Sequence, residues 1–243
     1  MLFPGILITV YFFPAILGPL SLAVDVVYLL DSSDSVTSQH YSDQKAFVKQ
    51  LSRSLNTMPA RTRGAVITYG STATVITKFD DTSTTDEFHS AINNAPKVGG
   101  PRRMDRAIDS ARNVFAKARP AVPKVVILLT TGNQPAGIQA RVLNTSFQKL
   151  YDLGARLYAV TISSEFIILP LRGSAGSDWF PVRSVTSLPI YVVPLARHVS
   201  YDTGKTKFRY FYQDYRYRSF SRDVIRFQNP KLKSHESFYL HEA

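Results

Sequence analysis

Cysteine is missing from this chain of 243 residues, which excludes a disulfide framework and any zinc site built on thiolates. Histidine is scarce, and its five copies lack the spacing that places two zinc ligands on one helix face. No Gly-x-Ser-x-Gly sequence is present, although a serine hydrolase would need such an elbow to expose its nucleophile. These absences argue against zinc enzymes and serine hydrolases.

Acidic residues are also in short supply. The 18 Asp and Glu face 29 Lys and Arg, which gives a formal charge of +11 and a sequence pI of about 9.8. Such an excess attracts polyanions over long range, so nucleic acid, sulfated glycans, acidic proteins and anionic membranes are all compatible partners. With 44% hydrophobic residues the chain can bury a core, and its length suits one α/β domain with extra segments at both ends.

Charged side chains are absent from Leu2 to Leu22, an apolar run interrupted by three prolines. A spanning helix needs about 20 apolar residues, so a retained anchor is the alternative interpretation of this run. The prolines, and the small residues that lead up to Ala23, favour a cleaved secretory signal peptide. We therefore expect residues 1–23 to be removed and the mature protein to be extracellular, with no membrane insertion after cleavage.

Apolar strands alternate with amphipathic helices after this leader. Buried strands are expected at 24–30, 63–69, 74–79, 124–130 and 156–162, and helices at 41–55, 86–93, 104–118 and 138–153. This alternation predicts an α/β fold whose parallel sheet is covered by helices on both faces. Because such sheets bind ligands at the carboxyl ends of their strands, the residues after Leu30 and Leu129 should line the site.

A polar loop, Asp31-Ser32-Ser33-Asp34-Ser35, follows the first strand. The spacing Asp-x-Ser-x-Ser places a carboxylate and two hydroxyls on one tight turn, which suits a hard cation such as Mg²⁺. The same composition is typical of an ordinary helix-capping turn. The loop alone therefore leaves both interpretations open.

The stretch from Val26 to Ser35 resembles the opening of a von Willebrand factor type A domain, whose metal-ion-dependent adhesion site begins with this motif. The resemblance continues at 99–108, 125–134 and 180–188 and covers about 24–199. It implies a doubly wound, mostly parallel, Rossmann-like sheet. It also implies a non-enzymatic extracellular-matrix or adhesion module that binds matrix proteins or acidic, sulfated polymers.

The sequence departs from that family at two ligand positions. A threonine of the second loop and an aspartate after the fourth strand usually complete the metal site, but Arg102 and Thr131 stand there. Of the family's metal ligands, only Asp31, Ser33 and Ser35 match. The resemblance therefore implies a degenerate metal site.

A guanidinium at this position adds a fixed positive charge about where a dication would sit. We expect Arg102 to pair with Asp31 in place of a cofactor ion, on a binding face that also includes Asp34 and Thr131. An Arg102 side chain turned toward solvent would instead leave a weak Mg²⁺ or Ca²⁺ site formed by Asp31, Asp34, the two serines and water. A metal-using enzyme or transport protein on the same fold would need the complete site.

Asn144-Thr145-Ser146 has the pattern of an N-glycosylation acceptor, which is meaningful because the leader indicates the secretory route. It lies within a predicted helix. We expect a glycoprotein modified at Asn144.

The composition changes at Tyr201. Residues 201–243 hold eleven aromatic residues and nine Lys or Arg against five acids, with basic and aromatic residues interleaved around Arg209, Arg216 and Arg218. Single-strand nucleic-acid platforms have this pattern, but a secreted protein meets acidic matrix polymers and not nucleic acid. A tail packed on the domain is the other alternative. We thus predict a signal peptide (1–23), a domain (24–200) and a basic, aromatic tail (201–243).

Overall fold

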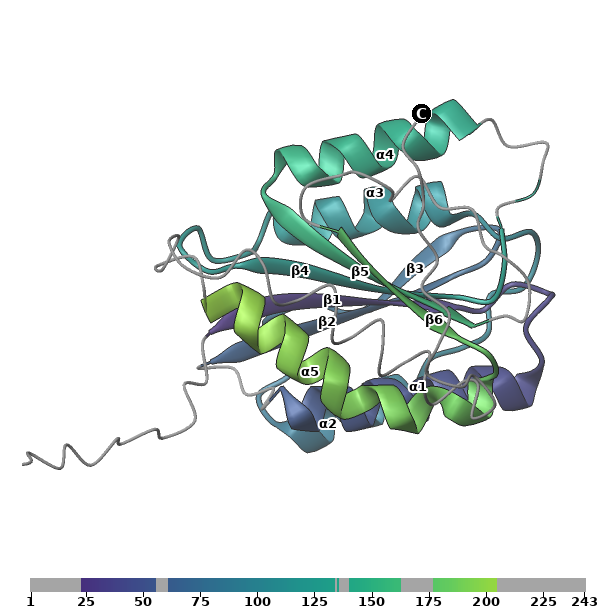
Figure 1. The fold of residues 1–243 in the computed structure, drawn as a ribbon, viewed down its shortest axis with the longest axis horizontal. Coiled ribbons are helices and arrows are strands. Elements are labelled where there is room, and N and C mark those ends of the chain that lie inside the picture. The colour runs from purple at the N-terminus through teal and green to yellow at the C-terminus, as the bar shows by residue number, and fades with distance from the viewer. Residues whose placement is uncertain (1–22, 56–60, 134, 136–139, 163–176, 205–243) are drawn as a thin grey trace, which may run out of the picture. The chain divides into compact units, whose positions relative to one another are not determined.

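The computed structural model describes residues 23–55, 61–133, 135, 140–162 and 177–204. Six strands form one sheet: β1 (Val24–Asp31), β2 (Thr62–Tyr69), β3 (Ala73–Thr77), β4 (Lys124–Thr130), β5 (Ala155–Ile162) and β6 (Ser177–Val182). Their order is β3-β2-β1-β4-β5-β6, with β3 antiparallel to β2 and the other neighbours parallel (Figure 1). The α/β fold with a doubly wound, mostly parallel sheet is therefore confirmed.

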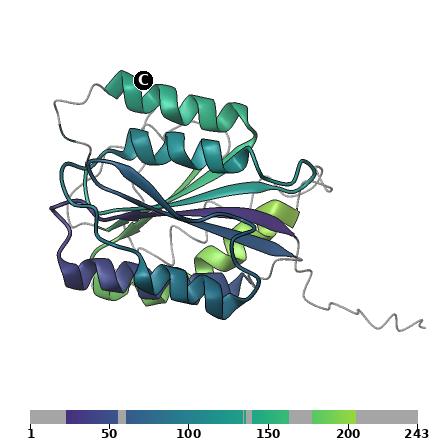
Figure 2. The same ribbon diagram turned by 180° about the vertical axis from the view of Figure 1, so that it is seen from behind.

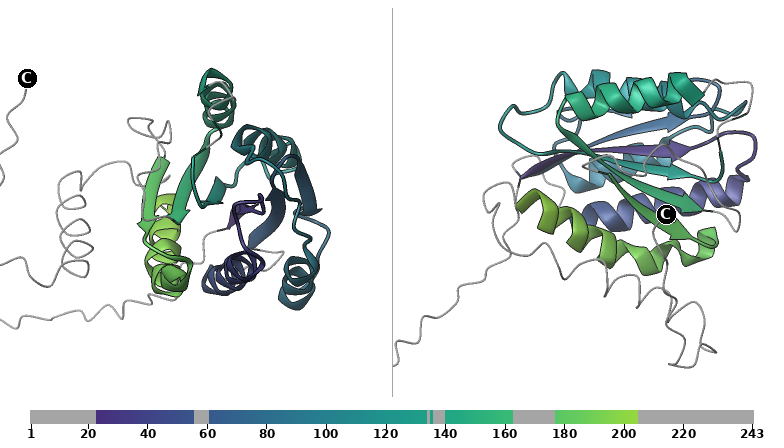
Figure 3. Two further views of the ribbon diagram at one scale, coloured as in Figure 1. Left: turned by 90° about the vertical axis from the view of Figure 1, so that its right-hand side faces the viewer. Right: turned by 45° about the horizontal axis from the view of Figure 1, so that its top comes forward.

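Within the described residues, five α-helices cover the two faces of this sheet. Helices α1 (Ser38–Ser54), α2 (Thr85–Asn94) and α5 (Leu188–Gly204) lie on one face. Helices α3 (Met104–Phe115) and α4 (Ala140–Asp152) lie on the other, as Figures 1 and 2 show. The two further views of Figure 3 show the sheet between these layers. No helix in the described part of the chain is long and apolar enough to cross a membrane.

The alternating side chains of β1 explain why its sequence is apolar throughout. Val26, Tyr28 and Leu30 pack into the core beneath α1 and α5. Val27 and Leu29 point the other way, into the core beneath α3 and α4. A central strand buried on both faces needs apolar residues at every position, because successive side chains point to opposite faces.

The strand order reverses between β1 and β4, which are neighbours in the sheet. The chain leaves β1 toward α1 on one face and leaves β4 toward α4 on the other. The loops that follow these two strands therefore diverge and leave space for a site between them. Asp31 closes β1 and Thr131 follows β4, so both lie at this point.

The structure differs from the expected elements mainly toward its C-terminal end. The sequence pattern did not predict β6 or α5, and α5 runs across the boundary expected before Tyr201 and ends at Gly204. Helix α1 begins at Ser38, earlier than expected, because the Thr37 side chain accepts a hydrogen bond from the His40 amide at 3.1 Å. Helix α3 ends at Phe115 instead of 118.

The amino ends of the strands are tied together by one buried carboxylate. Asp25 is fully buried and accepts hydrogen bonds from the guanidinium groups of Arg63 and Arg119 at 2.7 to 3.0 Å. The Arg119 amide adds a further bond at 2.8 Å. Burial raises the pKa of Asp25, but the hydrogen bonds from the two arginines outweigh it and hold that pKa below its usual value.

Candidate functional site

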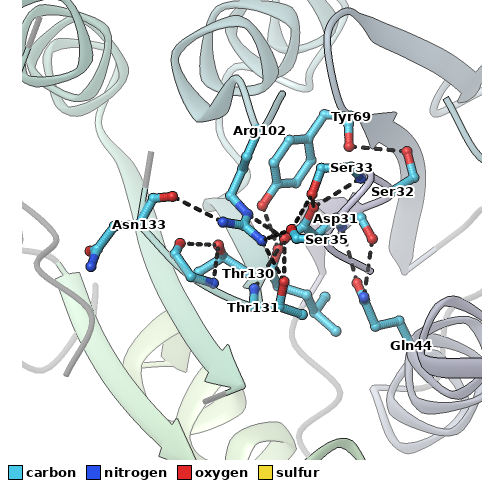
Figure 4. Close-up of polar contacts among 12 residues, drawn as sticks. Asp31, Ser32, Ser33, Ser35, Gln44, Tyr69, Arg102, Thr130, Thr131 and Asn133 are labelled. Carbon is cyan, nitrogen blue, oxygen red and sulfur yellow. Dashed lines mark hydrogen bonds and ion pairs between the residues drawn. The ribbon is translucent and has the colours of Figure 1, made fainter. Parts of the chain in front are cut away.

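Three loops meet beyond the carboxyl ends of β1 and β4 (Figure 4). They are the last residue of β1 with the loop that follows it (31–35), the loop that precedes α3 (99–103) and the loop that follows β4 (131–133). Each contributes side chains or backbone groups to one hydrogen-bonded cluster. The predicted site residues of all three loops therefore lie together.

Asp31 lies at the centre of this cluster and is fully buried. Its Oδ1 accepts hydrogen bonds from the Ser33 amide at 3.1 Å and the Ser33 hydroxyl at 2.7 Å. Its Oδ2 accepts from Arg102 Nε at 2.6 Å and from the amide and hydroxyl of Thr131, both at 3.0 Å. A carboxylate offers about four lone-pair positions, so these five donors fill its capacity.

Arg102 is 8% exposed, and its guanidinium uses four of its N–H groups within the cluster. Besides Asp31 it donates to the Asn133 carbonyl at 2.9 Å and to the Thr131 hydroxyl at 2.6 Å. Its remaining contact is a short hydrogen bond to the Ser35 hydroxyl. Arg102 thus joins the loop that precedes α3 to both of the other loops.

The hydroxyl groups have compatible donor and acceptor roles. Ser33 gives its single hydrogen to Asp31, so Ser35 must donate to Ser33 across their 3.0 Å contact, and Ser35 accepts from Arg102. Thr131 likewise donates to Asp31 and accepts from Arg102. Every hydroxyl in the cluster is therefore engaged by a neighbour.

Two further residues, which sequence analysis did not single out, support the cluster through hydrogen bonds to the backbone of β1 and β4. The side-chain amide of Gln44 on α1 makes two hydrogen bonds to the backbone of Asp31. It accepts from the Asp31 N–H at 3.0 Å and donates to the Asp31 carbonyl at 3.1 Å. Tyr69 of β2 donates its hydroxyl to the Leu129 carbonyl at 2.7 Å. Burial and the negative charge of Asp31 raise the pKa of Tyr69, which keeps this hydroxyl a neutral donor.

A signal for Gln44 was present in the sequence, because it lies among the residues of α1 that face the core, next to Phe47 and Val48. A polar side chain on an apolar helix stripe needs a buried partner. Tyr69 carried no such signal, since aromatic residues are common in strands.

Glycines let the three loops approach one another closely. Gly99 and Gly100 have φ of +74° and +73°, a left-handed conformation that side chains disfavour. The Gly100 carbonyl accepts from the Asp34 amide at 3.0 Å, which fixes the loop that follows β1. A Cβ atom on Gly132 would lie 2.8 Å from Arg102 Nη1, so this glycine makes room for the guanidinium.

The accessible part of this face differs from the buried cluster. Asp34 and Ser35 are exposed on the loop after β1, and Asn133 is exposed on the loop after β4. Asp34 therefore shares the loop of Asp31 but presents its carboxylate to solvent. Asn144 is exposed on α4. Arg209, Arg216 and Arg218 and the predicted leader lie outside the described residues.

The residues present do not fit a divalent cation. The Asp31 oxygens are saturated by donors, and a cationic side chain lies 2.6 Å from one of them. Within the described ranges no group of three or more His, Cys, Asp or Glu side chains could hold a metal ion. The cluster is built around an internal cation, the guanidinium of Arg102.

Comparison with known proteins agrees with this architecture. A family model, the von Willebrand factor type A domain, matches residues 25–175. Von Willebrand factor A domain-containing protein 1 of Mus musculus is 32% identical over 143 residues, 56% of this chain and 33% of that protein. The collagen alpha-6(VI) chain of Mus musculus is 28% identical over 164 residues, 65% of this chain and 7% of that protein. The chain spans a third or less of these relatives.

Solved structures share the fold. Proximal thread matrix protein 1 from the mussel byssus matches with a TM-score of 0.65 at 24% identity, over 74% of this chain and 47% of that chain. Another structure of the mussel protein, described as having a zinc occupied MIDAS motif, matches with a TM-score of 0.65 at 24% identity, over 74% of this chain and 46% of that chain. At this level of identity the likeness concerns the fold alone.

Proposed function

The chain belongs to the von Willebrand factor type A domain family, and from this premise we propose a secreted adhesion or extracellular-matrix module that binds its partner without a metal ion. It carries out no catalysis. Its partners are matrix proteins or acidic, sulfated polymers.

The observation that carries this proposal is the buried ion pair of Arg102 with Asp31. A dication about 4 Å from a guanidinium meets a repulsion of about 8 kcal/mol at an effective dielectric of about 20. A metal ion would therefore have to displace Arg102 from Asp31 and break its other hydrogen bonds within the cluster. The guanidinium takes the role of a permanent cation that joins the loops.

The same cluster argues against hydrolytic chemistry. The hydroxyl hydrogens of Ser33 and Thr131 are committed to Asp31. Asp31 in turn accepts from Arg102, so its carboxylate is engaged and poorly suited to act as a general base. A nucleophile without a free base nearby is weak.

An extracellular setting is supported by the leader and by the names of relatives. The apolar run from Leu2 to Leu22 suits a signal peptide (1–23) that is cleaved before Val24, where β1 begins. One relative is a collagen chain, and a structural neighbour is a thread matrix protein. The exposed Asn144 is accessible for glycosylation.

We assign protein recognition to the exposed groups above the cluster, chiefly Asp34, whose carboxylate is accessible. The basic and aromatic tail (201–243), with Arg209, Arg216 and Arg218, is proposed to contact acidic polymers. Metal-dependent binding by the incomplete site is the second candidate, because the mussel relative is described with zinc in its MIDAS motif.

A binding assay on decellularised matrix from the secreting cells tests the proposal. The full chain should bind equally in excess EDTA and in millimolar Mg²⁺, and Asp34→Asn should weaken binding several-fold. Asp86→Asn, which removes one exposed carboxylate on α2, is the matched control and should change nothing. Binding that is lost in EDTA would favour the metal-dependent candidate.

A further inference from the structure

Helices α3 and α4 lie on the face of the sheet opposite α5 (Figure 1), and a groove of about 340 Å³ is lined by residues of both. Both helices contribute to its walls. The lining residues are Asp109, Arg141, Val142, Thr145, Ser146 and Lys149. The groove is open to solvent, and two of its six lining residues, Arg141 and Lys149, are basic.

Helix α4 presents a polar stripe to this groove. Arg141, Thr145 and Lys149 follow one another at four-residue spacing, which places them on one side of the helix, and all three are exposed. With a rise of 1.5 Å per residue, Arg141 and Lys149 start about 12 Å apart along the helix axis. Two cations at that spacing suit successive anionic groups of a linear polymer better than a single small anion.

Helix α3 adds a carboxylate with an unused acceptor. The Asp109 side chain is 43% exposed, and its Oδ1 accepts no hydrogen bond within the described residues. The Arg112 guanidinium is 3.9 Å from it, too far for a hydrogen bond. This oxygen has lone pairs free to accept a hydrogen bond, so a ligand that supplies an O–H group can donate to it.

We propose that this groove binds a sulfated polysaccharide. Sulfate groups would pair with Arg141 and Lys149, and a sugar hydroxyl would donate to Asp109. An acidic peptide matches the cations equally well but brings no sugar hydroxyl for Asp109. The extracellular availability of such a polymer rests on the proposed function, whereas the binding itself does not.

Glycosylation at Asn144 is compatible with this groove. Asn144 directly precedes Thr145, and successive residues of an α-helix are turned by about 100°. Asn144 is not among the lining residues. A glycan there would leave the side of α4 that carries Arg141 and Lys149 accessible.

The test compares two double variants of the full chain on immobilised heparin over a range of salt concentrations. Arg141→Gln with Lys149→Gln removes the groove cations, and Lys97→Gln with Arg197→Gln removes two exposed cations elsewhere. Each lost contact lowers the slope of log affinity against log salt by about one unit, so the groove variant should lose about two. The control variant should keep the slope of the natural chain, and all proteins should melt alike. Equal slopes for the two variants would overturn the proposal.

Asp109→Ala, which removes both the charge and the acceptor oxygens, separates a sugar from a polyanion of any kind. The change removes a negative charge, so attraction by charge alone predicts tighter heparin binding. The proposed hydroxyl contact predicts weaker heparin binding, by about threefold or more, while binding to polyglutamate becomes tighter. Tighter binding to both probes would overturn the assignment to a sulfated polysaccharide. Because purified protein is used, a failure here is distinct from a failure of secretion or of metal-independent adhesion.

Discussion

Arg102 Nε lies 2.6 Å from Asp31 Oδ2, and both side chains are buried where the strand order of the sheet reverses. This pair joins residues 71 positions apart in the chain. The pair helps to hold the three loops together, because Arg102 also donates hydrogen bonds to the loop that follows β4.

Arg102→Ala should lower the free energy of unfolding by about 3 to 5 kcal/mol, because it leaves the buried Asp31 carboxylate without its cation. Urea denaturation followed by circular dichroism measures this loss. Arg197→Ala removes an exposed arginine on α5 and should change stability by less than about 0.5 kcal/mol. Equal effects of the two changes would show that the pair contributes little.

Gly132→Ala should destabilise the natural chain by about 1 to 3 kcal/mol, because the new methyl group would lie 2.8 Å from Arg102 Nη1. The guanidinium cannot move aside without losing its hydrogen bonds. In an Arg102→Thr background the same change should cost much less. A double-mutant cycle measures the coupling, and a value near zero would contradict the close packing of these residues.

The ion pairs of Asp25 make part of the stability depend on pH. The folded-state pKa of Asp25 lies below its ordinary value of 3.8, so the unfolded chain binds the proton more readily. The stabilisation is present above about pH 4 and is lost as the pH falls through the folded pKa. Asp25→Asn should therefore destabilise the protein at pH 7 by about 3 kcal/mol and flatten the decline of stability between about pH 5 and 3. An unchanged decline would assign acid sensitivity to other groups.

The sequence predicted most of the fold because its central strands are apolar runs between amphipathic helices. Helix α5 was missed because its residues are apolar on nearly every side and Pro194 lies within it, which removes the helical signal. Its Ile190 and Val193 side chains are exposed, so the apolar residues of this helix do not mark only the side that faces the core.

The candidate site was predictable in its residues but not in its geometry. The Asp-x-Ser-x-Ser spacing and the substitutions at Arg102 and Thr131 could be seen in the sequence. The direction of the Arg102 side chain depends on the Asn133 carbonyl and on the space above Gly132, which only the folded loops provide. The two hydrogen bonds between the Gln44 side chain and the Asp31 backbone likewise depend on how α1 packs against β1.

Secreted protein should begin at Val24, because the sheet begins there and the preceding residues form an apolar run that ends in small side chains. N-terminal sequencing of protein from the medium of expressing cells checks this. A Met1 terminus on that material, or retention of the chain in membranes, would refute the leader.

We propose that the Arg102 guanidinium takes the place of a metal ion beside Asp31. Isothermal titration calorimetry of the full chain with millimolar Mg²⁺ or Ca²⁺ should give no saturable heat, since Asp31 is already saturated by donors. The double variant Arg102→Thr with Thr131→Asp should acquire one saturable site, because it removes the guanidinium and adds a carboxylate ligand. Saturable binding by the natural chain that disappears in Asp31→Asn would contradict the account.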